Sequence, residues 1–141
     1  MKGVITYLNF DGNCRQAMEF YQRCFGAELF LMRYSEAPGD WPREAGDRVL
    51  HSTLSKGHAF LMGVDVVPGA PFQTGNNFSV LIHCESFQET AGLFTALGEN
   101  GKVTVPLQET FWAARYGMLT DQFGITWVFN LEKPGQSGPR P

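Results

Sequence analysis

The stretch VITYLNFDGNCRQAMEFYQRCFG, residues 4–26, decides the fold. It opens with a largely apolar, β-rich run at 4–10, which is typical of a strand. Turn residues follow, among which Asp11 or Asn13 is placed to cap a helix. Apolar side chains then recur at helical spacing until Gly26, where a left-handed residue would end the helix. The stretch therefore predicts a strand, a turn and a helix in close succession.

The rest of the first half predicts three more strands. The expected strands span 27–34, 48–55 and 59–64, and the last two are joined by a tight turn at Lys56-Gly57-His58. A Pro/Gly-rich segment at 35–46 interrupts them and is expected to be a loop. The predicted order of elements is β-α-β-β-β.

The second half repeats this pattern at an offset of 73 residues, which takes Ile5 to Phe78 and Tyr21 to Phe94. Ser86 and Glu89 have the spacing of a capping box at the start of the second helix. The other expected elements are a helix to Leu97 and strands at 77–84, 102–107, 115–120 and 125–131. We expect a single domain over 1–131, with module one at 1–66, module two at 75–131 and a flexible tail at 132–141.

Composition limits the partners. The chain has 141 residues and a net charge of −3, and it contains no basic run, so nucleic acid is not expected. No apolar stretch reaches the roughly 18 residues of a membrane span, and the first residues do not resemble a signal peptide. The three cysteines are odd in number and lack a C-x-x-C motif, which fits a cytoplasmic protein.

Two segments resemble a known family. Residues 7–17, with Phe20-Tyr21 and Phe25-Gly26, and residues 109–117 and 120–127 resemble the PhnB-like branch of the vicinal-oxygen-chelate superfamily. That superfamily includes glyoxalases, bleomycin-resistance proteins, fosfomycin-resistance enzymes and extradiol dioxygenases, and the similarity spans roughly 3–131. It implies an α+β fold in which two βαβββ modules form a U-shaped, mostly antiparallel sheet. The helices would cover the convex face, the site would lie on the concave face, and the protein would be a homodimer.

The resemblance also implies where a metal would bind. Enzymes of the superfamily hold a divalent metal with His and Glu side chains on the first and fourth strands of each module. The corresponding positions here are Ile5, Leu61 or Met62, Phe78 and Val128. None of these suits such a metal, so we expect no metal site and no cofactor. The histidines at 51, 58 and 83 have no metal-binding spacing, but His51 is a candidate general base or hydrogen-bond partner.

An apolar, aromatic-lined pocket with few polar groups is the usual form of a small-molecule site. The residues expected to contact a ligand are Tyr7, Asn9, Met62, Phe78, Trp112, Arg115 and Tyr116. Arg115 could bind an anion or stack on a ring. Alternatively, Trp112 and Tyr116 close the end of the sheet and Arg115 pairs with Glu109. Trp41, in the 35–46 loop, is a candidate lid residue or dimer contact.

The favoured function is that of a PhnB-like protein that binds a small, partly apolar molecule without the usual metal, by sequestration or in metal-free catalysis. One alternative is a metal-dependent lyase, isomerase or dioxygenase that uses His51 and perhaps Glu109. Another is a degenerate module for protein interaction, with Phe60 and Phe78 packed into the cleft. PhnB-like sequences have been described as demethylubiquinone methyltransferases. We do not expect that activity, because the sequence has no nucleotide-type glycine loop.

Overall fold

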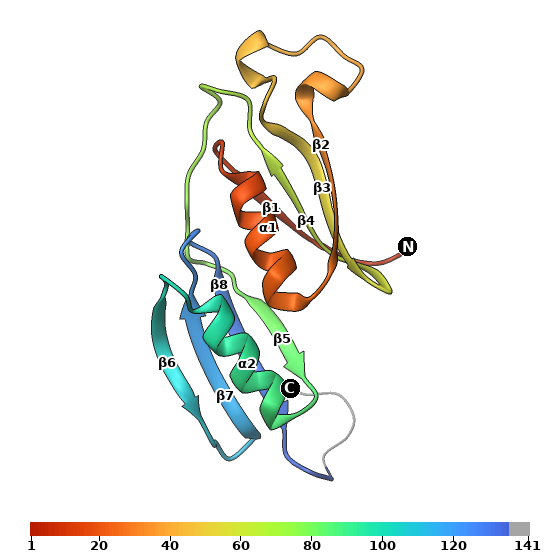
Figure 1. Ribbon diagram of the computed structural model, residues 1–141. Helices are drawn as coiled ribbons and strands as arrows, with labels where there is room; N and C mark the ends of the chain where they lie inside the picture. Colours follow the sequence, from red (N-terminus) through yellow and green to blue (C-terminus); the bar gives the residue numbers. More distant parts are fainter. Residues whose placement is uncertain (136–141) are drawn as a thin grey trace. The chain divides into compact units, whose positions relative to one another are not determined.

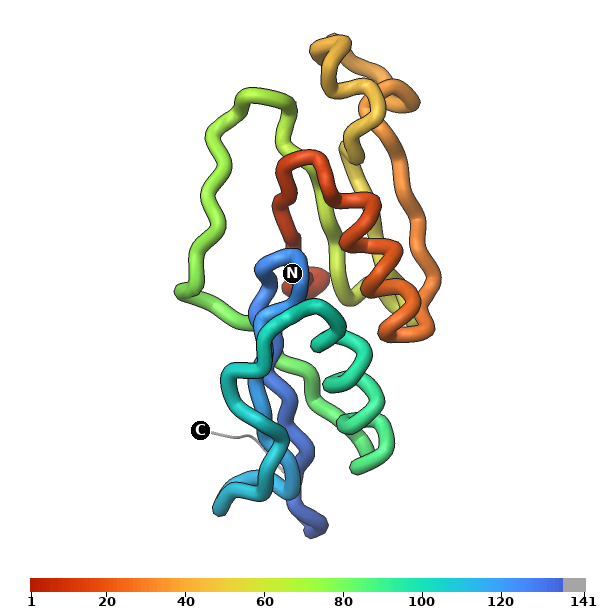
Figure 2. The backbone as a smooth tube through the Cα atoms, turned by 60° about the vertical axis from the view of Figure 1, so that its left-hand side comes forward, coloured from red at the N-terminus to blue at the C-terminus, as the bar shows by residue number. Residues whose placement is uncertain are grey.

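The computed structural model describes residues 1–135 and divides the chain into two compact units, Met1–Gln73 and Thr74–Pro141. Each unit holds one α-helix and one four-stranded sheet. Figure 1 labels these elements. The segment between the two sheets is extended, and Figure 2 traces it from the end of the first to the start of the second. No helix within residues 1–135 has the length and apolar character needed to cross a membrane.

The first unit is a βαβββ module. Its main elements are β1 (Thr6–Phe10), α1 (Cys14–Phe25), β2 (Glu28–Arg33), β3 (Val49–Lys56) and β4 (His58–Asp65). The strand order is β1-β4-β3-β2, with β1 and β4 parallel and the other pairs antiparallel. The helix packs on one face of the sheet, where the buried Met18 side chain lies over Gly63 of β4. Tyr21 of the helix and Leu8 and Leu54 of the sheet are also buried.

The second unit has the same plan. Its elements are β5 (Val80–Cys84), α2 (Phe87–Leu97), β6 (Lys102–Gln108), β7 (Ala113–Thr120) and β8 (Thr126–Glu132). The strand order is β5-β8-β7-β6, with β5 and β8 parallel. The helix covers one face, where the Phe94 and Phe129 rings meet edge to face at 5.0 Å. The prediction of two βαβββ modules in an α+β fold is confirmed.

The helix ends were predicted with one error. Gly26 ends α1 in the left-handed conformation (φ 61°), and the Ser86 hydroxyl accepts a hydrogen bond from the Glu89 N–H, both as expected. At the start of α1, however, Asn13 makes no side-chain cap. The Asp65 carboxylate, from the end of β4, accepts instead from the N–H groups of Gly12 (2.8 Å) and Cys14 (3.0 Å).

Element bounds differ from the predictions by up to three residues. The first strand of the second unit begins at Val80 rather than 77, and β7 begins at Ala113 rather than 115. The last strand continues to Glu132, so it takes the first residue of the expected tail. Residues 136–141 of that tail lie outside the described part of the chain. The loop at 35–46 contains two short 3-10 turns, Tyr34–Glu36 and Arg43–Ala45.

Candidate functional site

Each sheet has one face under its helix and one face without a helix, here called the open face. Side chains alternate between the two faces along a strand. A methyl group added at Gly63 would lie 2.9 Å from the Met18 sulfur, so Gly63 faces α1 and its neighbour Met62 lies on the open face. In the second unit Gly117 and Phe129 meet Phe94 of α2. Their strand neighbours therefore lie on the open face.

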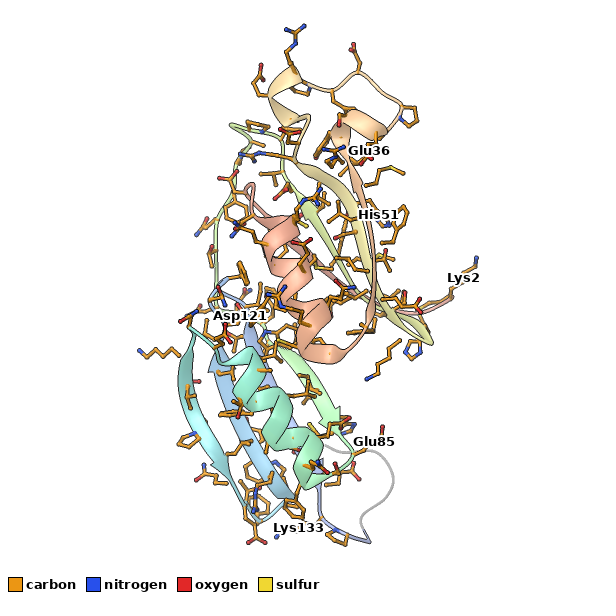
Figure 3. All side chains as sticks on the ribbon, in the orientation of Figure 1. Lys2, Glu36, His51, Glu85, Asp121 and Lys133 are labelled. Carbon is orange, nitrogen blue, oxygen red and sulfur yellow. The ribbon has the colours of Figure 1, made fainter. Side chains whose placement is uncertain are left out.

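The open face of the first unit gathers four of the predicted residues. Tyr7 pairs with Met62, which pairs with Thr53. Asn9 lies two residues after Tyr7 on the same face. The side chain of His51, labelled in Figure 3, is also there. Its Nε2 atom lies 3.1 Å from the Thr53 hydroxyl. The Phe30 ring lies beside the His51 ring, with the ring centres 6.1 Å apart, and Tyr7 is 50% exposed.

The open face of the second unit carries a row of polar side chains. Asn130 of β8 lies between His83 of β5 and Tyr116 of β7, and Tyr116 is paired in turn with Gln108 of β6. The Trp112 ring stands against the Tyr116 ring at 5.2 Å. The adjacent row is apolar and consists of Leu81, Val128 and Met118.

Comparison with known proteins identifies the family. The family model described as 3-demethylubiquinone-9 3-methyltransferase matches residues 2–129. The chain belongs to this family. The PhnB protein of Bacillus cereus, whose description carries the same methyltransferase name, is 28% identical, with a TM-score of 0.74 over 92% of this chain and 99% of that one. The resemblance to PhnB-like proteins is thereby confirmed.

Two further relatives cover nearly the whole chain. Protein YjdN of Escherichia coli K12 is 31% identical over 90% of this chain and 93% of its own. The structure of PA1353 from Pseudomonas aeruginosa is 37% identical, with a TM-score of 0.85 over 94% and 98% of the two chains. At the level of fold alone, a glyoxalase/bleomycin resistance protein/dioxygenase domain from Frankia has a TM-score of 0.63 at 18% identity, over 96% of each chain.

Two residues predicted to contact a ligand lie elsewhere in this PhnB-family chain than on an open-face strand position. Arg115 points to the helix side of its sheet, where its guanidinium carbon lies 4.7 Å from the centre of the Phe87 ring. Glu109, its expected alternative partner, pairs instead with Lys133 at 3.4 Å. Phe78 precedes β5 and is 60% exposed.

The structure also places Phe60, which the protein-interaction alternative put in the cleft. Its ring packs on the Phe25 ring of α1, with the ring centres 5.3 Å apart. Phe60 thus covers the end of the helix and does not fill the open face.

The donor set does not fit the divalent metal that the glyoxalase fold implies. Leu61 is buried on the helix side, and Met62 and Val128 offer no oxygen or nitrogen donor on the open face. Within residues 1–135 no group of three His, Cys, Asp or Glu side chains is placed to hold a metal ion.

The two buried carboxylates are already engaged by the fold. Asp65 accepts from three backbone N–H groups, the third being that of Val49 at 2.9 Å. Asp121 accepts from the N–H groups of Phe123 and Ile125, and from the Trp127 indole at 2.8 Å. Both are therefore parts of the scaffold.

Two cysteines, Cys14 at the start of α1 and Cys84 at the end of β5, are poor nucleophiles. Burial raises the pKa of the Cys14 thiol to about 12, partly offset by contact with the Ser52 hydroxyl 3.6 Å away. Burial likewise raises the pKa of Cys84. A thiol with a raised pKa is largely protonated at neutral pH and reacts slowly.

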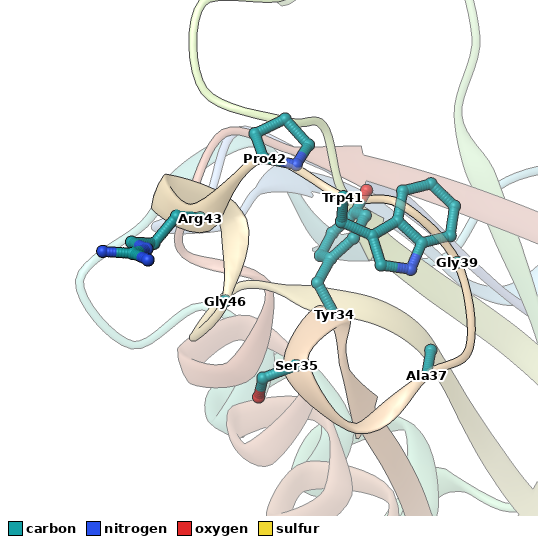
Figure 4. Close-up of a pocket in the computed structure, with 8 residues that line it drawn as sticks. All are labelled: Tyr34, Ser35, Ala37, Gly39, Trp41, Pro42, Arg43 and Gly46. Carbon is teal, nitrogen blue, oxygen red and sulfur yellow. The ribbon is translucent and has the colours of Figure 1, made fainter.

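Trp41 lies over a hollow of about 390 Å³ within its own loop (Figure 4). Its indole meets the buried Tyr34 ring edge to face at 5.2 Å. A side chain at Gly39 would lie 2.8 Å from the indole, and the φ of 135° at this position also favours glycine. The loop therefore holds Trp41 against Tyr34, while its predicted role as a lid or dimer contact stays a prediction.

Proposed function

We propose that this PhnB-family protein binds a small, partly apolar molecule on the open faces of its sheets, without the metal site of glyoxalase-type enzymes. The observation that carries the proposal is the make-up of these faces. They hold aromatic and aliphatic side chains with a few polar groups set among them, which is the usual composition of a small-molecule site. The positions where relatives would hold a metal are aliphatic, aromatic or thioether side chains.

The proposed contacts in the first unit are Tyr7, Asn9 and Met62, with His51 as a hydrogen-bond partner. The imidazole already contacts the Thr53 hydroxyl, and a ring nitrogen that faces an apolar surface can accept or donate a proton there. In the second unit the proposed contacts are Trp112 and Tyr116. Arg115 is left out because its side chain lies on the other face of the sheet.

Native mass spectrometry of protein purified without chelator tests this function. We expect a homodimer that retains no stoichiometric metal, and any organic mass that stays bound would be the natural ligand. The cytoplasmic location predicted from the sequence belongs to the same proposal. A stoichiometric divalent metal that is lost on His51→Ala substitution would overturn the proposal in favour of a metal-dependent enzyme.

A further inference from the structure

One pocket of the first unit lies in and beside the 35–46 loop. It is the hollow of about 390 Å³ next to Trp41, a volume within the range of roughly 300–1,000 Å³ that is usual for small-molecule sites. All the residues that line it lie between Tyr34 and Gly46, so the pocket belongs to the first unit alone. None of them is among the ligand contacts proposed above, so any ligand of this hollow would be a separate one.

The indole of Trp41 is held in place and yet stays accessible. Its ring meets the Tyr34 ring edge to face, with the ring centres 5.2 Å apart. Tyr34 is 6% exposed, and its hydroxyl donates to the Asp65 backbone carbonyl at 2.8 Å, so this support is part of the core. Trp41 itself is 41% exposed. The indole therefore presents an aromatic surface that a ligand does not have to order first, which favours binding.

The segment around the hollow is acidic. Residues 33–47 carry more acidic than basic side chains, namely Glu36, Asp40, Glu44 and Asp47 against Arg33 and Arg43. The Arg33 guanidinium lies 3.3 Å from the Glu36 carboxylate and 3.8 Å from that of Asp47, so these two share its charge. In the described part of the chain, Asp40 and Glu44 form no salt bridge. Their negative charges therefore remain uncompensated by a direct partner.

The one basic side chain that lines the hollow leaves its aromatic side free. This is Arg43, and Figure 4 shows its guanidinium directed away from Trp41. Asp40 directly precedes Trp41, and Glu44 follows three residues after it. Neither carboxylate lines the hollow, so both act on a ligand through their field, which extends over about 10 Å at 0.1 M salt. A positively charged ligand is attracted there, and an anion is repelled.

An accessible indole beside an acidic segment selects an organic cation, because the face of an aromatic ring attracts positive charge and indole does so most strongly. Among organic cations the guanidinium group fits best. It is planar, it is more weakly hydrated than an ammonium group, and it stacks on aromatic faces. We infer that the Trp41 hollow binds a small molecule through a guanidinium group stacked on the indole. The inference goes beyond the proposed function and does not depend on it, because it concerns other residues.

Nuclear magnetic resonance of the ¹⁵N-labelled full chain follows the indole N–H groups of the three tryptophans separately. Trp127 is buried and donates to Asp121, and Trp112 lies in the second unit, so both serve as internal controls. The probe is N-butylguanidinium. N-butylurea has the same stem and planar shape without the charge, and N-butylammonium carries its charge as a compact, strongly hydrated group. We expect butylguanidinium to shift the Trp41 signal alone and to bind at least about fivefold more tightly than either control.

Two variants separate the indole from the charge. Trp41→Leu keeps an apolar side chain without an aromatic face, so the three probes should then bind within about twofold of one another. Asp40→Asn changes an exposed side chain and keeps the inference testable if Trp41→Leu disturbs the loop. It should weaken butylguanidinium about twofold and leave butylurea unchanged, and the difference should vanish in 1 M salt.

Glu28→Gln is the matched control for the lost charge. Glu28 is exposed at the start of β2, six residues before Tyr34, which along an extended strand is about 20 Å. Its field is screened over that distance, so the substitution should change the binding of neither probe.

Three results would overturn the inference. If butylurea binds as tightly as butylguanidinium, the charge plays no part. If the Trp112 signal shifts as much as that of Trp41, the cation binds accessible indoles without selecting the hollow. If no probe shifts the Trp41 signal, or if neither variant changes the binding of butylguanidinium, the hollow is not a site for this group. None of these results bears on the open faces, which native mass spectrometry tests.

Discussion

The Asp65 carboxylate provides the sharpest test of how the first module holds together. It is 1% exposed and accepts hydrogen bonds from the backbone N–H groups of Gly12, Cys14 and Val49 at 2.8 to 3.0 Å. It therefore joins the start of α1 to the start of β3. Asp65→Asn replaces one acceptor oxygen with an NH₂ group that cannot accept. One backbone N–H then loses its partner, and the other two bonds lose the benefit of the charge.

A hydrogen bond to a charged group contributes about 1.5–3 kcal/mol, and a buried donor left without a partner costs about 1–3 kcal/mol. We therefore expect Asp65→Asn to lower the free energy of unfolding of the first module by about 3 kcal/mol. Because the chain has two compact units, a single unfolding transition cannot be assumed. Hydrogen exchange followed by mass spectrometry resolves the units, and the loss of protection should be largest in peptides from α1 and β3.

Asp47→Asn is the control. Its side chain is fully exposed at 101% and lies 3.8 Å from Arg33, so its removal should cost less than about 0.5 kcal/mol. If Asp65→Asn behaves like Asp47→Asn, the reasoning fails and the three N–H groups do not depend on the carboxylate.

Three further predictions concern packing and protonation. The raised pKa of Cys14 means that the folded state keeps a proton that the unfolded state loses above pH 9.0. Urea titrations of the parent and of Cys14→Ala should therefore give a difference in the free energy of unfolding that is constant below pH 9.0. Between pH 9.0 and about 12 the parent should lose up to ~1.4 kcal/mol per pH unit relative to the variant. Gly117→Ala should lower the free energy of unfolding by about 1–3 kcal/mol, because the added methyl group would lie 2.9 Å from the Leu107 side chain. Gly92→Ala is the control: it has open space in α2 and should raise the free energy of unfolding by about 0.5–1 kcal/mol. Thermal unfolding measures both. Gly26→Ala should lower the unfolding temperature by a few degrees, because the helix ends there at φ 61°.

Local sequence signals predicted the elements well because their causes are local. Helical spacing, the glycine after α1 and the capping serine of α2 each act within a few residues. The repeat at an offset of 73 residues added a second line of evidence, because the same order of elements was predicted independently in each half. The cap supplied by Asp65 could not be predicted in this way. It acts on Cys14 from 51 residues away, and only the pairing of β1 with β4 brings the two together.

The candidate site was only partly predictable from the sequence, because the face on which a side chain lies depends on strand pairing between distant residues. Strand alternation placed Tyr7 and Met62 on one face correctly relative to each other. Arg115 was expected beside Tyr116, but adjacent residues on a strand point to opposite faces, and the irregular pairing near Ala113 hides which is which. Asn130 was missed because a lone Asn in an apolar strand carries no motif. Only the strand pairing, which places it between His83 and Tyr116, shows that it belongs to a polar row.

The duplication of the module bears on why Asn130 is polar at all. Tyr7 pairs with Met62 in the first module as Leu81 pairs with Val128 in the second. Two residues further along each strand, Asn9 pairs with Val64 and His83 pairs with Asn130. Val64 therefore occupies the position in module one that Asn130 occupies in module two. Because the same fold accepts an aliphatic side chain at this position, the fold itself does not require an amide there.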